Sequence, residues 1–455
     1  MEVEMWNIKR IRKWSFTPGT IVVVLVLLIL GAVSVSVRAL TLVSETTWGG
    51  ADSEVTEGVA TASDGSIYVA GTTRSFGSRP SAPVIFLLKF EVDGTLAWQR
   101  TWEGPGDFAN HEARDVAVDS DGSAYVTGST TGIAGDAVLL KFAPDGTLAW
   151  QRTWGGSGTE SGQGVAVGPD GVVYVTGSTS SFGAGSGDIF AIKFASDGTL
   201  VWQKTWGTSE GEGGDGVAVA QDGSIYVAGV GPRSGAIGGA NVVLLKIDSI
   251  GNLVWQRTYA AGEIVDARGG VTVAPDDSVY VAGTLQEVKS NSVVVDAILL
   301  KFTPGGSLEW DRGWGGRDGD EAGGVAVASD GTVFLVGSTA SFGVAPDDAF
   351  LVQLQPNGKA TDAMTWGGAG LDKGNGVGIV PDGTIFLAGT AEAPPYSFLD
   401  AATKTSKLKG SLATPVVALV DAAGTVGDPA GVVSTPDGSL TFAGGFDAAL
   451  VRITP

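Results

Sequence analysis

The sequence predicts an all-β fold, an eight-bladed β-propeller of four-stranded antiparallel blades, and three observations predict it. A segment typified by GVAVGPDGVVYVTG recurs eight times, roughly 50 to 57 residues apart, which is propeller spacing. Each repeat holds four short runs rich in Val, Ile, Tyr, Trp and Thr between turn residues, as strands do. Residues 42–50 match the fourth run that the last repeat lacks.

The repeats give the order of the elements. Asp-Gly pairs such as Asp145-Gly146 and Asp170-Gly171 lie between runs, where they favour hairpin turns. A sheet with two apolar faces needs a neighbour on each side, so the repeats predict one domain over residues 40–455. The copies start at Gly58, Asp115, Gly164, Gly216, Gly270, Gly324, Gly376 and Gly431.

The two ends of the repeat region complement one another. The last copy stops at Ile453, inside its third run, and Leu42 to Gly50 matches a fourth run, with Trp48 in the place of Trp102. We therefore expect the first strand to complete the last blade, which leaves no long edge exposed.

The first 39 residues differ from the repeats. We predict a cytoplasmic basic segment over residues 1–20, with Lys9, Arg10, Arg12 and Lys13, and a hydrophobic helix over residues 21–39. Basic residues before an apolar segment favour a cytoplasmic N-terminus. Two alternatives remain open: a transmembrane anchor with the propeller outside the cytoplasm, or a signal peptide cleaved to give a secreted protein.

Composition excludes several functions. The formal net charge of −21 argues against nucleic acid as a partner. The chain has no cysteine and one histidine, His111, so thiolate metal sites lack their residues and a Ser-His-Asp triad would depend on His111 alone. We expect no cofactor, with carboxylate-bound Ca²⁺ as the alternative.

Tryptophans and arginines recur in the fourth run of each repeat. Trp150 and Trp154 stand four residues apart with Arg152 between them, so all three share one face of a strand. A position repeated in most copies favours packing between blades over ligand binding.

A carboxylate stands four residues before most first strands. A ring of such groups at the channel mouth could gather Ca²⁺ or Mg²⁺, or each could fix its own loop through backbone N–H groups. In the second copy Glu112 takes this role one residue later. The other candidates are Glu54, Glu160, Glu212, Asp266, Asp320 and Asp372.

One long insertion breaks the repeat at residues 390–413. It could form a lid or partner contact over the channel, or a solvated insertion. Its candidate residues are Tyr396, Phe398, Lys404, Lys407 and Lys409.

The stretch WGGSGTESGQGVAVGPDGVVYVTGSTSSFG, from Trp154 to Gly183, resembles the β-propeller repeat called SBBP. The resemblance covers about residues 42 to 454. It implies a propeller of the kind found in secreted or cell-surface proteins, and it implies little about activity.

These observations favour an exported, membrane-tethered propeller that acts as a binding or scaffolding module at the cell surface. We expect it to contact the membrane through its N-terminal helix and an extracellular protein or carbohydrate, and we favour a non-enzyme. The alternative is an extracellular propeller enzyme, either a carboxylate-based glycosidase or lyase or a quinoprotein-like enzyme.

Overall fold

The computed structural model describes residues 40–79, 82–104, 110–131, 135–232, 240–289, 292–343, 346–368, 370–392, 397–400 and 446–454. The predicted basic segment and hydrophobic helix, residues 1–39, lie outside these ranges. No helix long and apolar enough to cross a membrane occurs within the described ranges.

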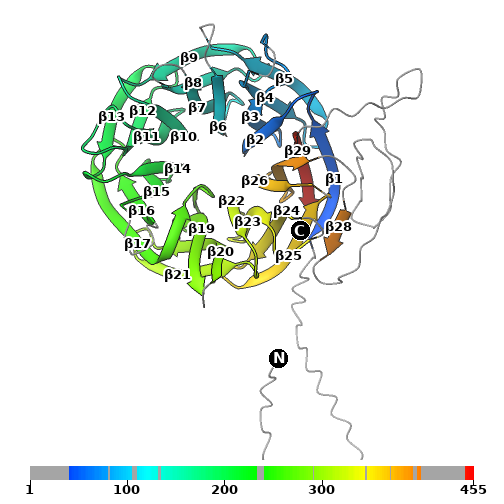
Figure 1. The fold of residues 1–455 in the computed structure, drawn as a ribbon. Coiled ribbons are helices and arrows are strands. Elements are labelled where there is room, and N and C mark those ends of the chain that lie inside the picture. Colours follow the sequence, from blue (N-terminus) through cyan, green and yellow to red (C-terminus); the bar gives the residue numbers. More distant parts are fainter. Residues whose placement is uncertain are drawn as a thin grey trace, which may run out of the picture. The chain divides into compact units, whose positions relative to one another are not determined.

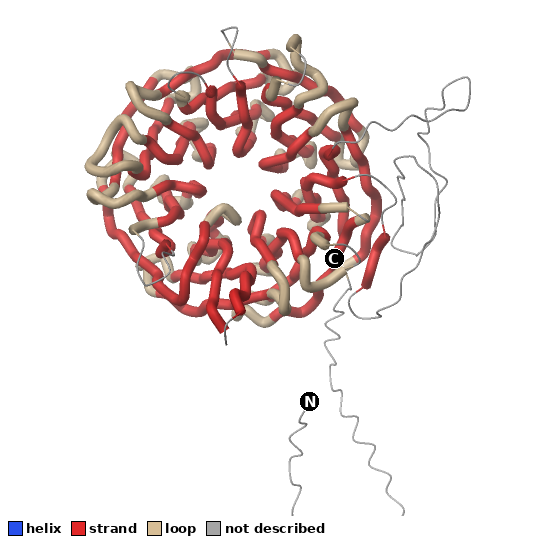
Figure 2. The backbone as a smooth tube through the Cα atoms, viewed as in Figure 1, coloured by secondary structure: helices blue, strands red, loops and turns tan. Residues whose placement is uncertain are grey.

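The propeller has seven blades arranged in a ring around a central channel (Figure 1). In each blade the first strand lies next to the channel and the fourth forms the outer rim, and neighbouring strands are antiparallel (Figure 2). Strands form most of the ring, and turns and loops connect them (Figure 2).

The strands of blades 1 to 3 follow one another along the chain. Blade 1 consists of β2 (Glu54–Thr61), β3 (Ile67–Thr73), β4 (Val84–Phe90) and β5 (Leu96–Trp102). Blade 2 consists of β6 (Asn110–Val118), β7 (Ala124–Thr131), β8 (Ala137–Phe142) and β9 (Leu148–Trp154). Blade 3 consists of β10 (Glu160–Val167), β11 (Val173–Thr179), β12 (Asp188–Phe194) and β13 (Leu200–Trp206).

Blades 4 and 5 are hydrogen-bonded to each other because β17 runs on from the rim of blade 4 and pairs with β19 of blade 5. Blade 4 consists of β14 (Gly213–Val219), β15 (Ile225–Val230), β16 (Ala240–Ile247) and β17 (Leu253–Asp266). Blade 5 consists of β18 (Val271–Val273), β19 (Val279–Lys289), β20 (Ser292–Phe302) and β21 (Leu308–Trp314).

Blades 6 and 7 close the ring. Blade 6 consists of β22 (Asp320–Val327), β23 (Val333–Thr339), β24 (Asp348–Leu354) and β25 (Ala360–Gly367), and β28 (Ser397–Asp400) adds a fifth strand outside β25. Blade 7 consists of β26 (Asp372–Ile379), β27 (Ile385–Glu392), β29 (Phe446–Thr454) and β1 (Thr41–Trp48).

The prediction of eight blades is wrong. The first strand does complete the last blade, with Trp48 opposite Ala448, but β29 pairs with β27 of the seventh repeat. Blade 7 contacts blade 1 directly, since Asn375 donates a hydrogen bond to the carbonyl of Thr56 at 2.6 Å. Blade 7 thus takes its third strand from the eighth repeat. The eighth copy of the motif, from Gly431, lies outside the described residues.

The structure does not test the expected N-terminal hydrophobic helix. The described residues form an all-β structure with no helix. The segment in which we placed that helix is not among them.

The core lies between the blades rather than within any one of them. The second and third strands are buried on both faces, for example β3 and β4 in blade 1, as strands covered on both sides are. Tyr68, Ile85 and Leu87 of blade 1 pack with Val116 and Leu140 of blade 2.

The rim strands tie each blade to the next, as the Trp-Arg-Trp pattern predicted. The guanidinium of Arg152 in blade 2 lies 5.2 Å from the ring centre of Trp150 and donates to the carbonyl of Gly198 in blade 3 at 2.7 Å. The indole N–H of Trp154 donates to Gln203 of blade 3 at 2.8 Å. Each arginine therefore stacks on its first tryptophan and reaches the neighbouring blade.

Candidate functional site

The innermost strands carry a β-bulge at the same place in almost every blade. In blade 1 the ladder between β2 and β3 shifts between Thr56 and Gly58, which leaves Glu57 without a partner residue. A bulge re-aims the extra side chain, here toward the channel. The bulged residues are Glu57, Arg114, Gln163, Asp215, Gly323 and Asn375.

Glycines after the bulges bring neighbouring inner strands into backbone contact. A Cβ at Gly164 would lie 3.0 Å from the Cα of Gly216, and a Cβ at Gly216 would lie 3.1 Å from the Cα of Gly270. Real Cβ atoms rarely come so close to backbone, so these positions need glycine. The channel wall is thus backbone here, and the bulged side chains provide its chemistry.

Blade 2 departs from this rule with Asp115 in the place of the glycine. Its carboxylate accepts the N–H of Val116 at 2.8 Å and the N–H of Val165 in blade 3 at 2.9 Å. Burial raises the pKa of Asp115 to about 7, and these two hydrogen bonds lower it less than burial raises it.

A cavity of about 480 Å³ occupies the end of the channel at which the first strands begin. That volume suits a small ligand or the end of a chain. Charged and amide side chains from six blades line it, namely Glu57, Arg114, Gln163, Asp215, Asp266, Arg268, Glu321, Lys373 and Asn375.

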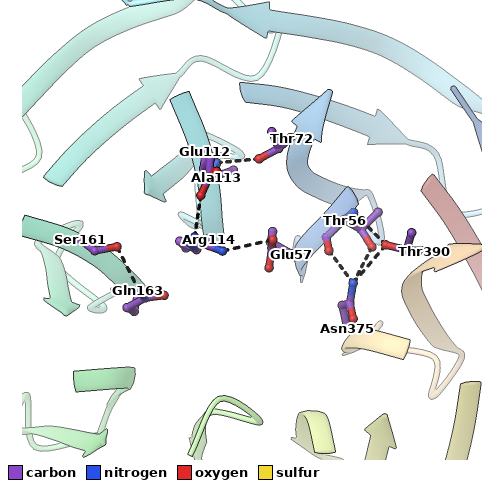
Figure 3. Close-up of polar contacts among 10 residues, drawn as sticks. All are labelled: Thr56, Glu57, Thr72, Glu112, Ala113, Arg114, Ser161, Gln163, Asn375 and Thr390. Carbon is purple, nitrogen blue, oxygen red and sulfur yellow. Dashed lines mark hydrogen bonds and ion pairs between the residues drawn. The ribbon is translucent and has the colours of Figure 1, made fainter. Parts of the chain in front are cut away.

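Arg114 forms the centre of one charged cluster in the cavity (Figure 3). Its guanidinium lies 2.7 Å from Glu112 and 3.4 Å from Glu57. Burial raises the pKa of Glu57 to about 7, while the positive charge of Arg114 lowers it less. Arg114 therefore already has two carboxylate partners.

Asp215 and Asp266 form a second cluster. Burial, followed by the negative charge of Asp266, raises the pKa of Asp215 to about 7. Burial also raises the pKa of Asp266, and the charge of Arg268 opposes that shift. The N–H of Ala267 donates to Asp215 at 3.3 Å. Asp215 and Asp266 therefore line the cavity together with the guanidinium of Arg268.

Asn375, Lys373 and Glu321 make further polar contacts in the lining. Asn375 donates to the carbonyl of Thr56 at 2.6 Å and to the hydroxyl of Thr390 at 3.3 Å (Figure 3). Lys373 lies 3.7 Å from Glu321 in an exposed ion pair. The polar side chains of the cavity therefore differ chemically from blade to blade.

The six carboxylates singled out in the sequence do not meet at one point. Five of them are buried at or just before the starts of separate first strands, and of the six only Asp266 lines the cavity. Glu160 is typical of the five, since it accepts the N–H of Gly156 at 2.8 Å and the hydroxyl of Thr179 at 2.8 Å. Glu54, Glu212, Asp320 and Asp372 likewise accept N–H bonds from Gly50, Thr208, Gly316 and Gly368.

The register explains why Asp266 differs from the other five. Asp266 pairs with Thr284, whereas Glu160 pairs with Thr179, the residue equivalent to Leu285. Asp266 thus corresponds to Ser161 and points to the channel. In blade 2 the equivalent of Glu160 is His111, which is buried against Trp102 with ring centres 4.8 Å apart. Glu112 corresponds to Ser161.

The residues proposed for a lid or partner loop are mostly outside the described part of the chain. The backbone of Phe398 lies in β28, opposite Trp366 on the outer rim of blade 6 (Figure 1). Tyr396, Lys404, Lys407 and Lys409 fall outside the described ranges.

The bulged residues were not singled out in the sequence, although a signal for them was present. The residue before the repeated GVAV motif changes from Glu to Arg, Gln, Asp and Asn between copies, while its neighbours repeat. A variable position inside a repeated strand indicates a side chain that does not serve the scaffold. Among the described residues, no three His, Asp or Glu side chains gather to hold a metal ion.

Two family models match parts of the chain. The beta-propeller repeat model SBBP matches residues 108–133, and a beta-propeller domain of unknown function, DUF5122, matches residues 168–200. The regulatory protein FlaEY of Caulobacter vibrioides is 28% identical over 179 residues, which are 34% of this chain and 18% of that protein. The match therefore spans a minor part of that relative.

Several solved structures are similar to this chain at low sequence identity and modest TM-scores. A protein of unknown function from Dyadobacter fermentans has a TM-score of 0.44 at 11% identity, covering 92% of this chain and 100% of that one. The periplasmic gluconolactonase of Pseudomonas aeruginosa has a TM-score of 0.44 at 15% identity, covering 68% and 84%. An ulvan lyase has a TM-score of 0.47 at 10% identity, covering 76% and 93%.

Proposed function

This chain is a β-propeller repeat protein, and from that premise we propose that it is a binding module whose ligand enters the charged end of the central channel. One observation carries the proposal. The scaffold residues repeat from blade to blade, whereas the bulged residues that point into the cavity differ. If these side chains served only to close the ring, we would expect the same residue to recur from blade to blade, as the glycines do.

The charges in the cavity favour a ligand with a positive, hydrogen-bonding group. Four acids, Glu57, Asp215, Asp266 and Glu321, line it against three cations, Arg114, Arg268 and Lys373. Arg114 is also paired with Glu112 outside this set. A primary amine or guanidinium would add donors where acceptors are in excess. Such groups occur on polyamines and on basic segments of partner proteins.

Calorimetric titration tests the ligand class, with spermidine as cationic probe and glucuronate as anionic comparison. We expect spermidine to bind, and Asp266→Asn and Glu321→Gln each to weaken binding about tenfold, since a charged hydrogen bond contributes about 1.5 to 3 kcal/mol. Asp197→Asn removes the same charge at an exposed rim turn and should bind as the wild type does. Tighter binding of glucuronate, or loss of affinity in Asp197→Asn alone, would contradict the proposal.

We also propose that the propeller works outside the cytoplasm, tethered or released at residues 21–39. Support comes from the sequence: four basic residues precede the uncharged run from Ile21 to Val37. Added protease should digest the propeller on intact cells. Digestion only after lysis would disprove export, and a mature protein that starts at Leu40 would select the cleaved signal.

A second candidate function is carbohydrate cleavage by Asp215 and Asp266. Burial and the mutual charge of the pair raise the pKa of Asp215 to about 7, which would keep one acid protonated beside another near neutral pH. A proton donor paired with a carboxylate is the arrangement that glycosidases use. Release of reducing ends from polysaccharides, abolished in Asp215→Asn, would support it. No release from neutral or anionic polysaccharides would leave the binding function.

A further inference from the structure

Pairs of carboxylates meet at four junctions between blades, away from the channel cavity. In each pair, an Asp at the start of a third strand lies beside the acid that precedes or begins the first strand of the next blade. The pairs are Asp136 with Glu160, Asp188 with Glu212, Asp296 with Asp320, and Asp348 with Asp372.

A glycine lies between the two acids, and the distances from an ideal Cβ on this glycine to the two carboxylate oxygens set an upper limit on the separation of the oxygens. A Cβ at Gly207 would lie 1.9 Å from Oδ1 of Asp188 and 3.0 Å from Oε2 of Glu212, so the two oxygens are at most about 5 Å apart. A Cβ at Gly155 would lie 2.0 Å from an oxygen of Asp136 and 2.5 Å from an oxygen of Glu160. The corresponding distances to the two acids are 2.2 and 2.6 Å at Gly315, and 2.1 and 2.7 Å at Gly367. Any side chain in place of these glycines would displace the acids.

At each junction, the Asp of the third strand, the acid of the next blade and the glycine between them are either all present or all replaced. Between blades 1 and 2 the equivalent residues are Val84, His111 and Glu103. Between blades 4 and 5, Asn241 and Ala260 replace the Asp and the glycine, and the segment before Asp266 has Ile264 and Val265. Between blades 7 and 1 the sequence has Asp447, Glu54 and Gly49. Acids that only capped separate loops would vary separately.

One oxygen at these junctions lacks a partner. Glu212 is 7% exposed, and its Oε1 accepts the N–H of Thr208 at 3.0 Å and the Thr208 hydroxyl at 2.6 Å. Its Oε2 is buried, accepts no hydrogen bond, and is directed toward Asp188. Two buried negative oxygens this close repel one another, and a buried oxygen without a partner is costly.

We propose that each paired-carboxylate junction binds one divalent cation of the Ca²⁺ type, with an oxygen from each blade as ligands. Ca²⁺ takes oxygen ligands at about 2.3 to 2.6 Å, so two oxygens on opposite sides of the ion stand up to about 5 Å apart, which is the limit found here. Because each site has only two carboxylates, we expect weak binding with a dissociation constant of about 10⁻⁴ to 10⁻³ M, as in extracellular Ca²⁺-binding modules. Each ion would join neighbouring blades.

The test is calorimetric titration of the full-length, chelator-treated protein with CaCl₂ at neutral pH and physiological salt, together with melting curves. We expect saturable binding of four or five ions per chain, one for each junction with both acids. Saturating CaCl₂ should raise Tm by roughly 5 °C or more relative to excess chelator.

Single substitutions locate the sites. Glu212→Gln keeps the shape and the acceptor for Thr208 but removes one charge, and it should lower the stoichiometry by one. Glu160→Gln should do the same at a separate junction, so that failure of one variant to fold leaves the other. Asp197→Asn, an exposed rim-turn control, should keep every site.

Two results would overturn the proposal. One is a Tm that does not respond to CaCl₂ together with no saturable binding, as expected if each pair shares a proton instead of an ion. The other is binding whose stoichiometry is unchanged in both Glu212→Gln and Glu160→Gln. Because these variants lie outside the channel cavity, neither result bears on the ligand proposed there.

Discussion

The carboxylate of Asp115 in blade 2 accepts the backbone N–H of Val165 in blade 3 at 2.9 Å, at a position where the other blades have glycine. This contact links two innermost strands through a side chain, whereas the other blades touch there through backbone. It also places a carboxyl group with a pKa raised to about 7 in the channel wall.

The first prediction concerns the pH dependence of stability. Burial raises the pKa of Glu45 to about 8 and the pKa values of Glu57, Asp115 and Asp215 to about 7. Between about pH 4 and pH 7 the folded protein therefore holds protons that the unfolded chain has released, so stability must fall as pH rises through this window. Melting curves should show a higher Tm near pH 5 than near pH 8.

One substitution at Asp115 and a control at Asp197 check the cause. Asp115→Gly restores the residue of the other blades, and it should reduce the loss of stability between pH 5 and pH 8 by about 1 to 3 kcal/mol. Asp197→Asn, whose carboxyl is exposed and has a lowered pKa, should leave that loss unchanged. A Tm that rises from pH 5 to pH 8 in the wild type would contradict the sign.

The second prediction concerns closure by β1. Deleting residues 40–50 removes the strand that pairs with β29 over seven residue pairs and exposes an apolar edge to solvent. The truncated protein should melt at a markedly lower temperature and aggregate, as unpaired edges do. Size-exclusion chromatography measures the aggregation, and a monomer as stable as the wild type would disprove this closure.

The third prediction concerns the number of blades. The strands of all seven blades lie among the described residues, outside residues 401–445. Replacing residues 405–440 with a Gly-Ser linker should therefore leave the melting temperature nearly unchanged. A linker of that composition spans the gap at little entropic cost. A large loss of Tm would show that the eighth repeat takes part in the ring.

The fourth prediction concerns the rim. Arg152 stacks on Trp150 and donates to the carbonyls of Gly198 and Asp197 at 2.7 and 3.2 Å. Arg152→Ala should lower the free energy of unfolding by about 1 to 2 kcal/mol. Arg152→Lys keeps the charge but not the forked donor geometry, so it should recover less than half of that loss. If the wild type, Arg152→Ala and Arg152→Lys were equally stable in urea, the stack would not contribute to stability as predicted.

The sequence by itself determined the local structure. The Val-rich and Tyr-rich runs, the Asp-Gly turns and the repeat spacing predicted four-stranded antiparallel blades, and the Trp48 run predicted the strand that closes the ring. These features are local or repeated, so each copy carries the same information as its neighbours. The packing role of Trp150 and Arg152 followed from the same repetition.

Only the tertiary structure decided the number of blades and the make-up of the cavity. Seven blades close because β26 packs directly on blade 1 and β29 pairs with β27, a matter of how twisted sheets meet after a full turn. The cavity depends on bulges that turn Glu57, Arg114 and Asp215 inward and on a register that separates Asp266 from Glu160. A shift of one residue reverses the face of a strand side chain, so spacing along the chain alone could not separate them.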